Sequence, residues 1–183
     1  DAENMITTFN ALLSIARIES GEGAGHMEAI DLVAVAQEMA ELYEPAAQDA
    51  GFILQLKTAP TPPIRGSRSL ISQAIANLLD NALKYAVGGT TIRIDVRKGS
   101  ENRVLLSVLD DGPGVPESDR DSVVKRFVRL EQSRSTPGSG LGLSLVSAIA
   151  RAHRASIALG DSSSNADRKG LKVTIAFPAF DKA

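Results

Sequence analysis

Apolar residues recur at helical spacing near the start of this chain. In residues 4–20, Ile6, Phe9, Leu13 and Ala16 follow one another at intervals of three or four. This spacing predicts a helix with a short coiled-coil seam, which needs a partner. A terminal helix that packs on its own domain remains an alternative.

Three later stretches have the same helical pattern, with one apolar face each. They are residues 31–50, 67–87 and 141–153. Gly51 is a plausible stop for the first, and Ser67 can cap the start of the second. A shorter helix is predicted to begin at Pro116, because acidic residues follow it and favour a helix N-terminus.

Alternating apolar and polar residues predict strands between these helices. The predicted strands are residues 27–32, 52–57, 90–98, 103–109, 155–159 and 171–177. The four residues from Gly99 to Asn102 predict a hairpin between two of them. Hairpins combined with one-faced helices predict an α/β fold, a two-layer sandwich whose mixed sheet carries helices on one face and is preceded by an N-terminal helix.

Glycine alternates with small or charged residues at positions 21–25. Glycine weakens both helix and strand formation, so this stretch is interpreted as a flexible joint. The predicted organisation is therefore a helical unit at residues 1–20, a joint at residues 21–26 and one domain at residues 27–183.

The helix at residues 67–87 carries an unusual polar edge. Asn77 and Asn81 lie one turn apart, and Lys84 or Tyr85 continues the same face. Asparagine is a poor helix former, because its amide competes for backbone hydrogen bonds. The two amides therefore either satisfy a buried polar contact or bind a ligand.

Composition narrows the classes of protein. The 183 residues fit one domain, and 43% hydrophobic content supports a core. With 20 basic against 22 acidic residues, the net charge of −2 does not favour nucleic acid as the principal partner. There is no cysteine, no apolar run of the roughly 18 to 20 residues that cross a bilayer, and no signal-peptide pattern at the start. We expect a cytoplasmic location and no direct membrane contact.

Three further segments follow the asparagine helix in a fixed order. They are Asp110-Asp111-Gly112-Pro113-Gly114, Arg126-Phe127-Val128-Arg129 and Gly138-Ser139-Gly140-Leu141-Gly142-Leu143-Ser144. With the asparagine helix they resemble the N, first glycine, F and second glycine boxes of the sensor histidine kinase ATP-binding domain. The resemblance implies the Bergerat ATP-binding fold, with ATP and Mg²⁺ as cofactors.

Asp110 stands at the end of a predicted strand, before a tight turn. An ionised carboxylate only accepts hydrogen bonds, so it suits the exocyclic amine of adenine and rejects the carbonyl of guanine. The resemblance gives Asp110 this adenine contact, with Gly112 and Gly114 letting the backbone approach. A plain β-turn is the alternative interpretation.

The glycine run at residues 138–142 opens directly into a helix, which makes backbone N–H groups available to phosphate oxygens. It has neither the Walker nor the dinucleotide spacing. The resemblance makes it the hinge of a lid over the phosphates. Arg126, Arg129 and Arg134 are candidate phosphate or lid charges, with ordinary surface arginines as the alternative.

The resemblance also assigns the remaining roles. Asn81 is the expected Mg²⁺ ligand, since its amide oxygen is a hard neutral donor, and Asn81 and Lys84 are the expected catalytic residues. The expected nucleotide-binding residues are Asn77, Asn81, Lys84, Tyr85, Asp110, Gly112, Gly114, Arg129, Gly138, Gly140, Leu141, Gly142 and Leu143.

The resemblance implies a protein-histidine kinase. His26 and His153 are the only histidines, and neither has the sequence setting of a phosphoacceptor. The γ-phosphoryl group is therefore expected to go to a histidine on a dimerisation helix that is not in this chain. Residues 1–20 would be the end of that helical hairpin. His153 is expected to cap or pack, and Arg154 departs from the Gly-Gly usual at the following turn.

The expected partners are the dimerisation hairpin and a response regulator receiver domain. The parent is expected to be a homodimer. An inner-membrane sensor is one alternative for its location. Two alternatives remain: a degenerate ATP-binding regulatory module without transfer, and an ATPase like gyrase B, Hsp90 or MutL. The ATPase predicts a catalytic glutamate in the asparagine helix, where this chain offers Asp80.

Overall fold

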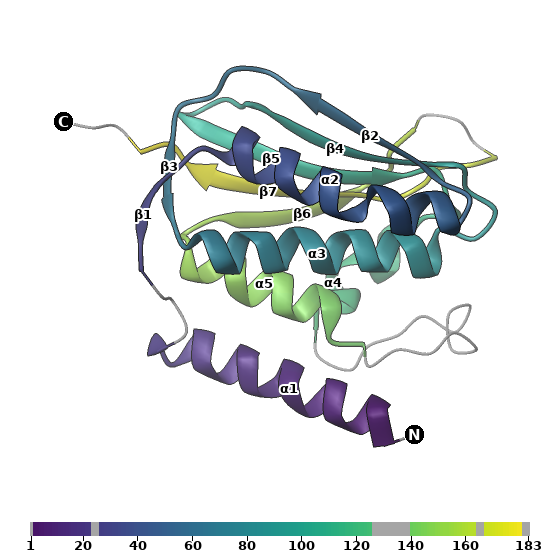
Figure 1. The fold of residues 1–183 in the computed structure, drawn as a ribbon, viewed down its shortest axis with the longest axis horizontal. Helices are drawn as coiled ribbons and strands as arrows, with labels where there is room; N and C mark the ends of the chain where they lie inside the picture. Colours follow the sequence, from purple (N-terminus) through teal and green to yellow (C-terminus); the bar gives the residue numbers. More distant parts are fainter. Residues whose placement is uncertain (1, 23–25, 126–139, 164–166, 181–183) are drawn as a thin grey trace.

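The computed structural model describes residues 2–22, 26–125, 140–163 and 167–180 (Figure 1). Its centre is a five-stranded sheet in the order β2-β4-β5-β7-β6. The strands are β2 (Ile53–Thr58), β4 (Thr91–Lys98), β5 (Arg103–Asp110), β6 (Ser156–Gly160) and β7 (Lys172–Pro178). Strand β2 pairs with β4 in parallel, whereas every other pair in this sheet is antiparallel. The sheet is therefore mixed, as predicted.

Three helices cover one face of this sheet: α2 (Leu32–Asp49), α3 (Arg68–Tyr85) and α5 (Gly142–Ala152) (Figure 1). Alternate residues of the central strands point into this interface, and Ile92, Ile94 and Val96 of β4 are all buried. The α/β sandwich predicted from the pattern is confirmed.

Several shorter elements complete the fold. Strand β1 (Glu28–Ile30) pairs antiparallel with β3 (Ile64–Gly66), a strand that the sequence pattern did not predict. The helix predicted from Pro116 is a 3₁₀ turn, η2 (Glu117–Asp119), followed by the single helical turn of α4 (Arg120–Val123). These elements lie outside the main helix layer.

The helix ends follow the predicted capping chemistry. The side chain of Ser67 accepts a hydrogen bond from the Leu70 N–H at 3.4 Å, which caps α3. Gly51 follows the end of α2 and its C-cap Ala50, and its φ of +81° is a left-handed conformation that glycine adopts without strain. Both predicted boundary residues are confirmed.

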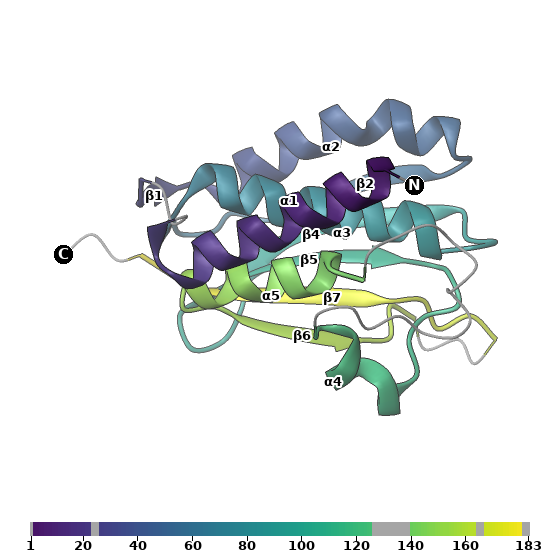
Figure 2. The same cartoon turned by 90° about the horizontal axis from the view of Figure 1, so that it is seen from below.

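Helix α1 (Ala2–Glu19) lies against the outside of α5 (Figures 1 and 2). It buries Ile15 and Ile18, and Arg151 of α5 pairs with Glu19 at 3.2 Å. The predicted seam faces elsewhere, since Ile6 and Phe9 are about 60% exposed (60% and 61%). The helix thus has one face on its own domain and a second apolar face in the open.

No helix within the described ranges combines the length and apolarity that crossing a bilayer requires.

Candidate functional site

The polar edge of α3 forms one wall of the candidate site. The opposite face of the helix is buried in the core, as its amphipathic pattern predicted. Asn77 donates from Nδ2 to the Gln73 carbonyl at 2.8 Å, so its amide is held by its own helix. Asn81 and Tyr85 are half-buried and Lys84 is exposed. This geometry leaves Asn81 as the amide of this edge that faces another element.

The start of α5 lies directly beside Asn81. A Cβ added at Gly142 would lie 3.0 Å from Asn81 Oδ1 and 3.3 Å from Nδ2. A side chain here would be in tight contact with the amide, so Asn81 would have to shift by a few tenths of an ångström. The first N–H groups of an 11-residue helix have no partner within the helix. The backbone N–H groups at the start of α5 therefore lie close to the amide oxygen of Asn81.

Leu141 and Ser144 fix this helix start. Leu141 is 1% exposed, and its carbonyl accepts hydrogen bonds from Ser144 Oγ at 2.9 Å and from the Leu145 N–H at 2.9 Å. Gly140, just before it, has a φ of +71°, in the left-handed region. Leu143 is half-buried. A buried leucine thus anchors the start of α5.

Asp110 ends β5, and within the described ranges only its Oδ1 accepts hydrogen bonds. Its Oδ1 accepts hydrogen bonds from the Gly112 N–H at 2.9 Å and the Leu171 N–H at 3.3 Å. Among the described residues, none donates to Oδ2. Burial raises the pKa of the Asp110 carboxyl above its usual value, although the two N–H groups lower it. The side chain is therefore oriented, partly buried and left with an unused acceptor.

Asp111 is held quite differently. Its Oδ1 accepts from the Thr90 N–H at 2.8 Å and the Thr91 N–H at 2.9 Å, and its Oδ2 accepts from Thr90 Oγ1 at 2.9 Å. Burial alone would raise the pKa of this carboxyl, but these hydrogen bonds outweigh it and the pKa is lowered. Asp111 fastens the loop before β4 and is not available to a ligand.

The glycines of the turn permit close backbone contacts. A Cβ at Gly112 would lie 2.5 Å from Ala86 Cα, at the end of α3. Gly114 has a φ of +77°, and a Cβ there would lie 2.5 Å from the Gly170 carbonyl oxygen. The turn is thus pressed against the end of the asparagine helix and against the loop before β7.

Two residues that support the turn from Asp110 to Gly112 were not predicted from the sequence. Ser162 Oγ donates to the Asp110 carbonyl at 2.5 Å, and the Gly170 N–H donates to the Gly112 carbonyl at 3.0 Å. Gly170 has a φ of +60° and no room for a side chain against Asp110. Both lie in the polar turn after β6, which has no pattern that connects it with β5.

Some expected site residues lie outside the described ranges. These are Arg126, Phe127, Arg129, Arg134, Gly138 and Ser139. The described part of the site is therefore the α3 edge, the Asp110 turn and the start of α5.

Asp80 points from α3 toward α2. The hydroxyl of Tyr43 donates to Asp80 Oδ1 at 3.1 Å, and burial together with Asp80 raises the pKa of Tyr43. This contact gives Asp80 a structural role between α2 and α3. A catalytic carboxylate in this helix would have to face the candidate site, and Asp80 is engaged with the neighbouring helix.

His153 connects the far ends of α3 and α5. Its Nε2 accepts from the Ser67 N–H at 3.0 Å, and its Nδ1 lies 2.7 Å from the Ile149 carbonyl. These contacts fit a neutral ring with the proton on Nδ1. The side chain is 4% exposed, and burial lowers its pKa. His153 therefore packs and caps, as expected from the sequence.

With this geometry established, comparison with known proteins identifies the family. Residues 66–181 match the family described as "Histidine kinase-, DNA gyrase B-, and HSP90-like ATPase". The matched segment runs from the start of α3 through β7, and it contains the complete candidate site. The chain belongs to this family.

Its relatives and structural neighbours are sensor histidine kinases. It is 29% identical to the sensor-like histidine kinase SenX3 of Mycolicibacterium smegmatis, across 87% of this chain and 42% of that protein. It is 30% identical to the signal transduction histidine-protein kinase/phosphatase MprB of Mycobacterium leprae, across 96% of this chain and 33% of that protein. The chain spans less than half the length of these relatives.

The fold comparison agrees. Full-length ShkA in complex with AMPPNP superposes with a TM-score of 0.80 at 26% identity, covering 98% of this chain and 37% of ShkA. The resemblance and the fold class that the sequence indicated are both confirmed.

Proposed function

We propose that this chain is the ATP-binding catalytic part of a sensor histidine kinase, which transfers the γ-phosphoryl group of ATP to a histidine on a dimerisation helix. The observation that carries this proposal is the contact between Asn81 and the start of α5 at Gly142. It brings together an amide oxygen that suits a hard cation and N–H groups that suit phosphate oxygens.

Each described residue then has a role. Asp110 offers Oδ2 to the exocyclic amine of adenine. Gly112 and Gly114 let the backbone of the turn approach the nucleotide. The N–H groups after Gly140 and Leu141 orient the phosphates, with Leu143 beside them. Arg129 and Gly138, which the resemblance adds to this set, belong to the same proposal.

The edge of α3 completes the proposed site. Asn81 is the residue that would hold Mg²⁺, and its half-buried amide beside Gly142 fits an ion that takes most of its ligands from phosphates and water. Bound Mg²⁺ supplies charge that offsets the negative phosphates. Lys84 adds a positive charge nearby, Tyr85 forms a wall and Asn77 supports the edge. A protein catalyses phosphoryl transfer mainly by positioning the reacting groups and by stabilising their charge.

The proposal also covers the organisation of the chain. Residues 1–20 would be the end of the dimerisation hairpin, residues 21–26 a joint and residues 27–183 the catalytic domain. The exposed seam of α1, with Phe9 61% exposed, supports a helical partner there. Partners of the proposed kinase are that hairpin, in a homodimeric parent, and a response regulator receiver domain. We place this part of the protein in the cytoplasm.

A phosphotransfer assay tests the proposal. The chain is incubated with γ-labelled ATP, Mg²⁺ and the separately expressed dimerisation hairpin of the parent. We expect an acid-labile phosphohistidine on the hairpin with the wild-type chain, and none with Asn81→Ala. ATP binding without transfer would instead support a regulatory module. Hydrolysis without transfer would support a gyrase B-, Hsp90- or MutL-like ATPase.

A matched pair of glycine variants tests the geometry. Gly142→Ala places a methyl group against Asn81, so we expect weaker ATP binding by calorimetry. Gly160→Ala is the control, because a Cβ there meets nothing within 4 Å. Equal ATP affinity of the two folded variants would contradict the proposed arrangement.

A further inference from the structure

Exposed large hydrophobic side chains lie in a second place besides α1. Leu42 of α2 is 68% exposed, Ile53 of β2 is 65% exposed and Leu56 of β2 is 38% exposed. Ile53 and Leu56 lie on the outermost strand of the sheet, at the edge that the proposed nucleotide site does not use, whereas Leu42 lies on α2 outside the groove described below. The proposed function gives these residues no role.

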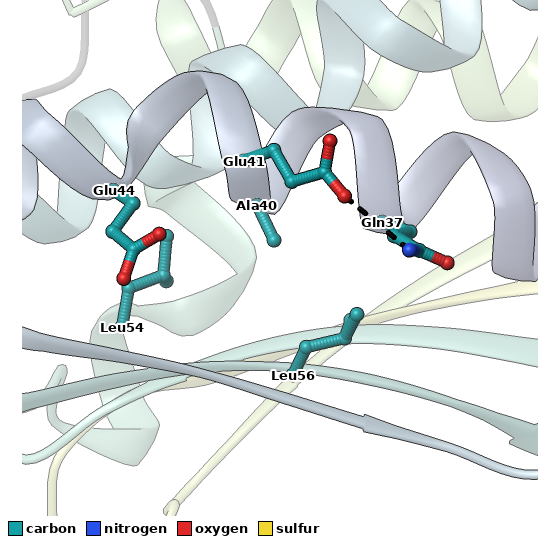
Figure 3. Close-up of a pocket in the computed structure, with 6 residues that line it drawn as sticks. All are labelled: Gln37, Ala40, Glu41, Glu44, Leu54 and Leu56. Atoms are coloured by element: carbon teal, nitrogen blue, oxygen red, sulfur yellow. Dashed lines mark hydrogen bonds between the residues drawn. The ribbon is translucent and has the colours of Figure 1, made fainter.

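Between α2 and β2 runs a groove with a volume of about 250 Å³ (Figure 3). Its lining residues are Gln37, Ala40, Glu41, Glu44, Leu54 and Leu56. Figure 3 shows the leucines on the strand side and the glutamates on the helix side. The groove therefore has an apolar floor and an acidic rim.

The strand that forms the floor has a free edge. Strand β2 is the outermost strand of the five-stranded sheet. The Ile53 N–H donates to the Thr90 carbonyl, and the Ala59 N–H donates to the Val96 carbonyl. In a parallel ladder alternate residues bond to the same neighbour, so the odd-numbered residues of β2 face β4. The backbone N–H and C=O groups of Leu54, Leu56 and Thr58 therefore point away from the sheet.

The free backbone groups and the groove belong to the same residues. Leu54 and Leu56 turn their side chains to the groove and their N–H and C=O groups to the open edge. An incoming strand that paired with them would place every second side chain in the groove, next to α2. The edge and the groove thus form one docking surface.

The charge of the groove's rim indicates which side chains an incoming strand would carry. Glu41 and Glu44 are exposed, and neither forms an ion pair in the described part of the chain. Glu41 Oε1 accepts from Gln37 Nε2 at 3.3 Å. Pro45 has no N–H, so the Glu41 carbonyl lacks its helical donor. The rim offers acceptors and negative charge.

We propose that this groove binds an extended, basic segment of a partner protein, which adds as a strand to the free edge of β2. Lys or Arg at alternate positions lays its aliphatic stem on Leu54 and Leu56 and places its charge at Glu41 and Glu44. A second copy of this chain fits less well, because its own glutamates would face these across the joined edges.

A synthetic peptide tests this surface directly. The probe is the blocked hexapeptide Lys-Val-Lys-Val-Lys-Val, and its control is Glu-Val-Glu-Val-Glu-Val. With isotope-labelled protein we expect saturable shifts of the Leu54, Leu56 and Thr58 amides with the lysine peptide only. Affinity should fall with rising salt. Equal binding of both peptides, or shifts confined to β6, would overturn the proposal.

A charge-reversal pair gives the second arm. In Glu41→Lys/Glu44→Lys we expect at least tenfold weaker peptide binding. The control Glu28→Lys/Glu101→Lys makes the same change in net charge at exposed sites away from the groove. Equal peptide affinity of the two variants would overturn the proposal, as would β2 amide shifts that depend on protein concentration without peptide.

This test is independent of the proposed kinase function. Glu41 and Glu44 lie outside the proposed nucleotide site, so we expect unchanged ATP affinity in the reversed variant. Its fold is checked by thermal midpoint and amide spectrum. Loss of peptide binding with retained ATP binding separates the two proposals.

Discussion

At the scale of single residues, Asp110 and Asp111 show how neighbours of one type acquire different tasks. Both oxygens of Asp111 accept hydrogen bonds from Thr90 and Thr91. Asp110 uses Oδ1 alone, for Gly112 and Leu171. These contacts support Asp110, and not Asp111, as the residue proposed to contact the base, and the sequence Asp-Asp-Gly alone does not distinguish the two.

The first prediction concerns base selection. In Asp110→Asn the oxygen can still accept from Gly112 and Leu171, so the NH₂ group takes the place of Oδ2. A donor there opposes the amine of adenine and suits the carbonyl of guanine. Loss of a charge-assisted contact worth ~1.5 to 3 kcal/mol weakens the ATP Kd by roughly ten- to a hundredfold.

Calorimetry with ATP and GTP measures this change. We expect the ratio of ATP to GTP affinity to fall, and the thermal midpoint not to fall, because burial disfavours the charged carboxylate. Asp110→Ala is the control, which weakens ATP without favouring GTP. An unaltered ATP preference in Asp110→Asn would contradict the assigned role.

Two helices end in the same motif with different residues. After α2, the Phe52 N–H donates to the Ala47 carbonyl, with Gly51 between them. After α5, the Ala155 N–H donates to the Ala150 carbonyl, and Arg154 takes the left-handed conformation at a φ of +53°. Both are Schellman ends, but only the first has glycine.

The second prediction uses these matched positions. Arg154→Gly removes a left-handed side chain, and we expect a gain of about 1 kcal/mol in the free energy of unfolding. Gly51→Ala should lose a similar amount, since a Cβ there meets nothing and only the backbone conformation changes. Urea denaturation measures both. The same sign for the two variants would refute the explanation.

At the scale of elements, α3 and α5 are joined at both ends. The start of α5 meets Asn81 near the end of α3, and His153 after α5 accepts from Ser67 at the start of α3. The two helices are thus antiparallel neighbours whose relative position is fixed by one contact near each end. Slippage of either helix would displace the proposed phosphate and metal contacts together.

The third prediction is a dependence of stability on pH. Burial lowers the pKa of His153 below its usual 6.5, so the unfolded chain binds the proton more readily. The free energy of unfolding rises with pH wherever the unfolded state holds more protons. The His153 contribution is therefore complete above about pH 6.5 and is lost as the pH falls toward the lower folded-state pKa.

Urea denaturation between about pH 5 and pH 7 measures this dependence. In His153→Gln we expect lower stability and a smaller slope against pH. His26→Gln is the control, because His26 is exposed and should leave the slope unchanged. An unchanged slope in His153→Gln would exclude this histidine as the source.

The sequence predicted most elements because their signals are local. The apolar stripe of α3 with its Ser67 cap, and the hairpin around Gly99, depend on residues close together in the chain. Strand β3 was missed because it has three residues and exists through pairing with β1, more than thirty residues earlier. The support of the turn from Asp110 to Gly112 by Ser162 and Gly170 was missed for the same reason, since no local pattern reports it.

At the scale of the whole molecule, α1 has two apolar faces with different surroundings. Its periodicity identified an apolar seam, and the structure places the neighbouring face, with Ile15 and Ile18, against α5. The alternative of packing on its own domain thus holds for one side of this helix, and the partner of the exposed seam stays a prediction. A pattern can identify an apolar face, but which partner it meets depends on the rest of the fold.

The fourth prediction separates the two faces of α1. Ile15→Ala removes a side chain that is 1% exposed, so we expect a loss of about 2 to 5 kcal/mol in the free energy of unfolding. Phe9→Asp changes an exposed residue and should alter stability by no more than about 0.5 kcal/mol. In the parent kinase, Phe9→Asp should weaken self-association in sedimentation experiments.

Comparable destabilisation by both variants would show that the seam packs on this domain. Unchanged self-association of the parent with Phe9→Asp would contradict the proposal that the seam packs on a helical partner.

Helix α5 lies between α1 and α3 and contacts both of them. Its 11 residues span roughly 16 Å of rigid rod. Near one end Arg151 pairs with Glu19 of α1, and at the other end a Cβ at Gly142 would lie 3.0 Å from Asn81 Oδ1, a tight contact. Helix α5 therefore connects α1 with the edge of α3 that carries the proposed metal and phosphate contacts.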